Sequence, residues 1–175
     1  MKLCLLVIFY NVLLIKSNML GPADLIFKTF EECDESKNVI DVSITQRRYN
    51  RSVHLLDLVV STPYDIGEEV ILELKGWMKK EGGYKPGTFY MKDKACVVLN
   101  KLMGDTFLDM LNAVGVEDCP LPAGNHEAPA YYFDNDKFTV PQVYGEYKMD
   151  IFLSKDDEMQ SCFIAMYDMV PKEKS

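Results

Sequence analysis

Apolar and polar side chains alternate along much of this 175-residue chain, and the alternation leaves few folds open to it. In a β-strand successive side chains point to opposite faces, so a period of two places the apolar residues on one face. Turn-forming sequences separate five segments that show this pattern or a continuous apolar run: Asn38–Gln46, Arg51–Val60, Glu69–Met78, Gly145–Leu153 and Met159–Val170. The sequence therefore predicts an all-β fold, an antiparallel immunoglobulin-like β-sandwich or β-cup.

Two segments add detail to this prediction. Arg51–Val60 becomes apolar on both faces toward its end, which is typical of a central strand. Between Asp105 and Gly115, apolar residues including Phe107, Met110 and Leu111 recur at helical spacing, and a glycine is common just past the end of a helix. We therefore expect one short helix, which either packs in the core or forms a mobile wall of a cavity.

The N-terminus has the form of a secretory signal peptide. Lys2 precedes an apolar stretch from Leu3 to Ile15, which is shorter than the roughly 20 residues that a membrane-spanning helix needs. We expect a signal peptide over residues 1–20, cleaved between residues 17 and 23, and one secreted, extracellular domain over residues 24–175. The alternative is an uncleaved membrane anchor.

Charge and composition exclude two classes of protein. The formal charge is −8, and loss of the two lysines in the leader makes it −10. Proteins that bind nucleic acids neutralise phosphates with Lys and Arg, so we expect no nucleic-acid partner. With 48% hydrophobic residues the chain can build a core, which argues against a disordered protein.

Four cysteines remain after the leader: Cys33, Cys96, Cys119 and Cys162. In an oxidising compartment they imply two disulfides, and the residues alone leave all three pairings open. Their spacing contains no Cys-x-x-Cys and no nearby histidine, so we expect no metal site. Asn50 begins a glycosylation sequon in a polar turn, and we expect it to be modified in a secreted protein.

The sequence offers little chemistry for catalysis. Of the two histidines, His54 falls inside a strand pattern and is expected to be structural, whereas His126 follows Gly124-Asn125 and is expected in a solvated loop. The motifs of serine hydrolases, zinc proteases and nucleotide-binding loops are absent from the sequence. We therefore predict no catalytic residue, no cofactor and no enzymatic activity.

Methionine is frequent for a chain of this size. Its flexible, polarizable side chain suits adaptable apolar surfaces, whereas a tightly specified core uses fewer methionines. Two interpretations remain open, which are ordinary core filling and the lining of a cavity for a flexible hydrophobic ligand. Eight methionines follow the leader: Met78, Met91, Met103, Met110, Met149, Met159, Met166 and Met169.

Several of these features occur in an order that resembles a known family. Cys96 in the segment KACVVLN is followed by the amphipathic segment and then by Cys119-Pro120-Leu121-Pro122-Ala123-Gly124. A strand-like AYYFDNDKFTVP, then Tyr144-Gly145-Glu146-Tyr147 and a cysteine-bearing last strand complete the pattern. From about Asp41 to Met169 the chain resembles the insect CheA/CheB-type secreted proteins, relatives of the ganglioside activator within the ML lipid-recognition superfamily.

The resemblance implies a single ML-like lipid-recognition domain, a cup-like β-sandwich whose apolar cavity takes lipid acyl chains. It also implies the pairings Cys33–Cys162 and Cys96–Cys119. Within this scheme the inward-facing strand and helix residues are candidates for ligand binding, and an alternative position for Trp77 is the cavity mouth, with its indole N–H toward water. The candidate set is Leu72, Leu74, Trp77, Met78, Phe107, Met110, Leu111, Met149, Ile151 and Leu153.

Three classes of function fit the sequence. The first is a secreted carrier of a lipid or other hydrophobic small molecule, in insect chemosensory or pheromone perception. The second is an extracellular interaction module that has a filled core and meets a receptor or a membrane surface. The third is a glycolipid-presenting cofactor of a hydrolase, against which the absence of the ganglioside activator's extra rim cysteines counts.

Overall fold

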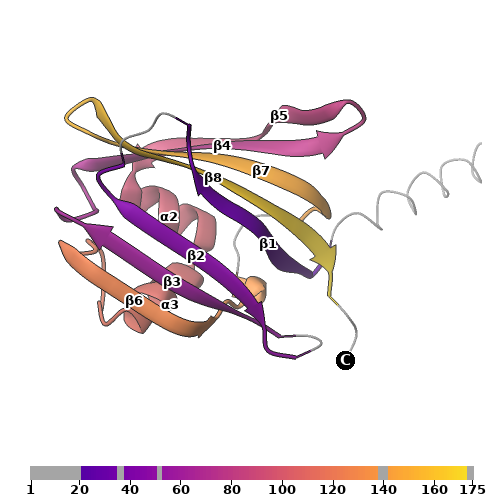
Figure 1. Ribbon diagram of the computed structural model, residues 1–175, viewed down its shortest axis with the longest axis horizontal. Coiled ribbons are helices and arrows are strands. Elements are labelled where there is room, and N and C mark those ends of the chain that lie inside the picture. The colour runs from indigo at the N-terminus through magenta and orange to yellow at the C-terminus, as the bar shows by residue number, and fades with distance from the viewer. Residues whose placement is uncertain (1–20, 35–37, 51–52, 138–141, 173–175) are drawn as a thin grey trace, which may run out of the picture.

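The computed structural model describes residues 21–34, 38–50, 53–137 and 142–172, which form two antiparallel β-sheets and two helices (Figure 1). The larger sheet has the order β1-β8-β7-β4-β5 and the smaller sheet the order β2-β3-β6. The larger sheet contains β1 (Ala23–Glu32), β4 (Val70–Lys80), β5 (Gly83–Lys94), β7 (Gly145–Lys155) and β8 (Glu158–Pro171). The smaller sheet contains β2 (Asp41–Arg48), β3 (His54–Thr62) and β6 (Gly124–Tyr132).

The predicted all-β sandwich is confirmed. The five segments chosen by their alternation correspond to β2, β3, β4, β7 and β8, and β3 is the central strand of its sheet as expected. The strand expected over residues 130–141 is partly wrong, because β6 begins earlier, at Gly124, and ends at Tyr132. A 3₁₀ turn, η1 (Asn135–Lys137), follows it, and residues 138–141 lie outside the described residues.

The expectation of a single helix is also incomplete. The predicted helix is α3 (Asp105–Ala113), and a second helix, α2 (Ala95–Met103), precedes it with Gly104 at φ +56° between them. Locally, Val97-Val98-Leu99 favours a strand, but Ala95, Val98 and Leu102 recur at helical spacing. Tertiary packing decides the outcome, since α2 contacts β4 and β5 and Val98 is only 1% exposed.

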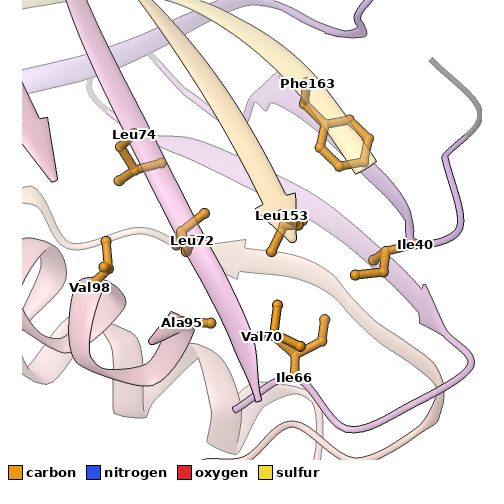
Figure 2. Packing of buried hydrophobic residues seen from close by; sticks show 9 residues of the cluster. All are labelled: Ile40, Ile66, Val70, Leu72, Leu74, Ala95, Val98, Leu153 and Phe163. Atoms are coloured by element: carbon orange, nitrogen blue, oxygen red, sulfur yellow. The ribbon is translucent and has the colours of Figure 1, made fainter. Parts of the chain in front are cut away.

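A cluster of buried apolar residues lies where α2 packs against β4 (Figure 2). Leu72 and Leu74 of β4 face Ala95 and Val98 of the helix, and Figure 2 shows Leu153 beside Leu72 on the neighbouring strand β7. Because residues i, i+3 and i+4 of a helix share one face, α2 can cover part of the inner face of β4, around Leu72 and Leu74.

The two disulfides pair as the resemblance implies. Cys33 follows the end of β1 and bonds to Cys162 of β8, with 5.4 Å between their Cα atoms. Cys96, in the first turn of α2, bonds to Cys119 in the segment between α3 and β6, with Cα atoms 6.2 Å apart. The second bridge therefore ties the helices to the loop that leads into the smaller sheet.

Two predictions concern the N-terminal segment and the glycosylation sequon at Asn50, which lie wholly or partly outside the described residues. The expected signal peptide over residues 1–20 lies outside the described residues, and β1 begins at Ala23. Asn50 is exposed in the turn between β2 and β3, but Arg51 and Ser52 of its sequon lie outside the described residues, so its glycosylation stays a prediction. In the described part of the chain, no helix has the length and apolar character to cross a membrane.

Candidate ligand-binding cavity

An apolar cavity of about 240 Å³ lies between the two sheets and is bordered by both helices. Among its described lining residues, Ser43 and His126 are the two with polar side chains. Cys119 also lines the cavity, but its sulfur is held in a disulfide. The lining consists of Phe30, Ile40, Val42, Ser43, Ile44, Leu58, Val60, Ile66, Leu72, Ala95, Leu99, Phe107, Met110, Leu111, Val114, Cys119, Leu121, His126, Ile151, Leu153 and Phe163.

Aromatic side chains fill the neighbouring space between the sheets and limit the cavity to one end. The rings of Tyr147 and Tyr167 stack with centroids 5.4 Å apart, and Phe27 contributes a third ring 6.3 Å from that of Tyr167. Burial raises the pKa of both tyrosines, so their hydroxyls stay neutral. This end of the sandwich is therefore closed by packed rings and offers no room for a ligand.

The other end of the cavity lies beside the edge strand β2. Ser43 lines the cavity and is itself exposed, and Phe30 of the adjacent strand β1 is partly exposed while it stacks on Phe163. Further along the same edge, the side chain of Gln46 bridges β2 and β1. It accepts a hydrogen bond from the Phe27 amide at 2.9 Å and donates one to the Leu25 carbonyl at 3.1 Å. Gln46 therefore ties β2 to β1 beside Phe27.

The structure brings six of the ten candidate ligand-binding residues to the cavity wall: Leu72, Phe107, Met110, Leu111, Ile151 and Leu153. Leu74 and Met149 lie in the filled core, and Met78 packs in the cluster around Tyr147. Alternation assigns residues to a face of a sheet but does not tell how far along that face a cavity extends. The aromatic residues and α2 determine that extent.

Trp77 does not occupy the predicted position. Its indole Nε1 donates a hydrogen bond to Asp150 Oδ2 at 2.7 Å, and the ammonium of Lys148 lies 5.4 Å from its ring centroid. Trp77 alternates with the inward residues Leu72 and Leu74 and so projects to the outer face of the larger sheet. The expectation that its N–H points to water at the mouth is wrong, because a carboxylate on the same outer face accepts the bond.

The interpretation that the methionines line the cavity is wrong as well. Of the eight methionines after the leader, Met110 alone contributes to the described lining. Met159 is 60% exposed, and Met103 and Met169 are buried in packed clusters. Branched aliphatic and phenylalanine side chains make most of the wall, and their restricted rotamers keep the space open better than flexible thioethers would.

The smaller sheet contributes a wall that the candidate set omits. Val42 and Ile44 of β2 and Leu58 and Val60 of β3 face the cavity. The alternation that predicts β2 already places Val42 and Ile44 on one face, so that pattern was the signal for them. No sequence signal shows which of the two sheets contributes more of the wall, since this depends on how the sheets separate.

His126 is not in a solvated loop, which corrects the sequence expectation. It lies in β6, pairs with Val60 of β3 and lines the cavity while partly exposed. Its Nε2 is 2.8 Å from the Pro122 carbonyl oxygen. The run Pro122-Ala123-Gly124 favours a turn locally, but pairing with β3 extends the strand back to Gly124.

Metal ligands do not gather in the part of the chain that the structure describes. No group of three or more His, Cys, Asp or Glu side chains there is placed to hold a metal ion. His54, the second histidine, lies in β3 beside a small hollow of about 20 Å³. The cavity between the sheets is the candidate functional site because its described walls are almost wholly apolar.

Fold and site together define a two-sheet, disulfide-bonded antiparallel β-sandwich with an apolar cavity between its sheets. Comparison with models of known protein families finds no match, and comparison with curated proteins finds no match either.

Proposed function

We propose that this protein is a secreted, non-enzymatic carrier of a lipid or another hydrophobic small molecule. The observation that supports this most is the cavity of about 240 Å³ whose described walls are almost wholly apolar. Protein interiors normally pack with few voids larger than a water molecule, so a space of this size is unusual for a core that serves stability alone. The resemblance to secreted insect lipid-recognition proteins favours the same role, in chemosensory or pheromone perception.

The energetics suit a ligand with a hydrocarbon chain. An engineered cavity of about 150 Å³ lined by Leu, Ile and Phe stays dry and binds benzene. Burial of each methylene contributes about 0.8 kcal/mol, so about ten buried methylenes supply about 8 kcal/mol before ordering losses. A hydrocarbon ligand would displace little water from these walls and lose few hydrogen bonds.

The first experiment asks whether a ligand is present. The mature protein is purified, extracted with organic solvent and examined by mass spectrometry, and a fluorescent fatty-acid probe is titrated into the delipidated protein. We expect a copurified hydrophobic compound or saturable probe binding that unlabelled lipid reverses. If neither is found, the carrier function is wrong, and an extracellular interaction module becomes the better explanation.

A matched pair of variants places the binding in the cavity. Val60 lines the cavity, whereas the next residue, Val59, is 40% exposed on the other face of β3. V60F adds four carbon atoms to the cavity wall and is expected to exclude about four carbon atoms of the ligand. The binding free energy should fall by about 3 kcal/mol, which is about a 100-fold loss of probe affinity. V59F is expected to leave the affinity within about threefold of wild type. Equal affinities of the two variants would show that the probe binds elsewhere.

A further inference from the structure

His126 is the ionisable side chain that the described cavity wall contains. It stands in a row across the smaller sheet, since Val42 pairs with Val60 and Val60 pairs with His126. All three residues line the cavity, so the imidazole and the two valines form one continuous strip of wall. A ligand whose chain lies along the valines would bring one of its ends close to the ring.

The hydrogen bond to the loop fixes which ring nitrogen carries the proton. Nε2 lies 2.8 Å from the Pro122 carbonyl oxygen, and a carbonyl can only accept. Nε2 therefore holds the proton in the neutral ring, and Nδ1 is a hydrogen-bond acceptor. Within residues 21–34, 38–50, 53–137 and 142–172, no side chain or backbone group is found to donate to Nδ1.

We propose that Nδ1 of His126 accepts a hydrogen bond from a hydroxyl group of the ligand, so that the cavity prefers amphiphiles with one donating head group and a hydrocarbon tail. This inference rests on the carrier function proposed above and specifies its ligand class. A hydroxyl donor on the ligand satisfies this acceptor while the hydrocarbon tail stays on the apolar walls. An ether or ester of equal length offers no donor to Nδ1.

The two parts of the ligand have separate partners in this arrangement. The imidazole receives the hydroxyl at β6, and the tail contacts the inner face of the larger sheet at Ile151 and Leu153. Ile151 faces inward yet is partly exposed, which shows that the cavity reaches the middle of β7. The tail thus determines most of the affinity, and His126 determines the choice of head group.

The test compares 1-decanol with decyl methyl ether, which has the same alkyl chain but cannot donate a hydrogen bond. Both compounds compete with the fluorescent probe on wild type, H126F and H126N. The measured quantity is the ratio of the two affinities, because differences in tail packing cancel in it. Phe fills a similar space without an acceptor, whereas the Asn side-chain oxygen can take the place of Nδ1.

We expect the preference for the alcohol to fall about fivefold from wild type to H126F, the effect of one neutral hydrogen bond. In H126N the preference is expected to stay close to the wild-type value. An unchanged ratio in H126F, or an equal fall in both variants, would overturn the role of Nδ1 while the carrier function stands. If neither compound displaces the probe and the probe itself does not bind, the carrier function fails, and this inference fails with it.

Discussion

Removal of the two disulfides, one at a time, is expected to destabilise the protein unequally. Cys33 and Cys162 are separated by 129 positions in the sequence, and Cys96 and Cys119 by 23. A cross-link stabilises largely by lowering the entropy of the unfolded chain, and that effect grows with the logarithm of the loop length. Near room temperature the relation gives about 5 kcal/mol for the long loop and about 3.4 kcal/mol for the short one. The expected difference between the variants is therefore about 1.5 kcal/mol.

The measurement is urea denaturation of wild type and of the double variants C33A/C162A and C96A/C119A. The free energy of unfolding should fall more in C33A/C162A. Domains of this kind are stable by about 5–15 kcal/mol, so a stabilising osmolyte keeps the weaker variant within the measurable range. A loss in C96A/C119A that equals or exceeds that in C33A/C162A would refute the loop-entropy reasoning.

The same variants are expected to rank in the opposite order for ligand binding. Cys119 lines the cavity, and its bridge to Cys96 holds α2 against the loop beside β6, whereas Cys33 and Cys162 are not in the described lining. Probe affinity should therefore fall further in C96A/C119A, although this variant is the more stable of the two. Equal affinities in the two variants would show that the helix tether does not shape the cavity.

Two further predictions concern stability. Ser161 is 1% exposed, and its hydroxyl accepts hydrogen bonds from the amides of Val39 at 3.2 Å and Ile40 at 2.9 Å. In urea denaturation, S161A should lose about 2 kcal/mol of unfolding free energy, whereas S154A, at a partly exposed position, should lose less than about 0.5 kcal/mol. Similar losses in the two variants would contradict a structural role for the Ser161 hydroxyl. Burial, helped by the negative charges of Asp109 and Asp134, raises the pKa of Tyr131 to about 12. As the pH rises, the unfolded chain releases the Tyr131 proton before the folded chain does, so the stabilising contribution of Tyr131 is complete below pH 10 and is lost as the pH rises toward 12. Y131F should therefore flatten the fall in unfolding free energy that is measured across that range. An unchanged slope in Y131F would contradict this role of Tyr131.

Alternation along the chain predicts much of the larger sheet because each residue's face is decided by its own strand. In β4, Val70, Leu72 and Leu74 point inward, as their period of two requires. The pattern fails at β5, where Pro86 and Gly87 interrupt the alternation of an edge strand. It also fails at α2, where a local preference for strand gives way to packing on β4.

The candidate site shows a similar division. Phe107, Met110 and Leu111 could be predicted as cavity residues because helical spacing puts them on one face of α3. Met78 and Met149 share their sheet face with true lining residues, yet they pack where the space is already filled. His126 could not be predicted, since its inward position depends on pairing with a strand that lies more than sixty residues earlier.

The sequence by itself determined the fold class, the number of disulfides and the apolar face of the strands that alternate, because these follow from local alternation and composition. The tertiary structure alone decided where the two sheets separate, which end the tyrosine rings close and which polar group reaches the apolar wall. A cavity is the space left between elements that are distant in sequence. Its size and lining therefore depend on how those elements pack against one another, and no single segment encodes that arrangement.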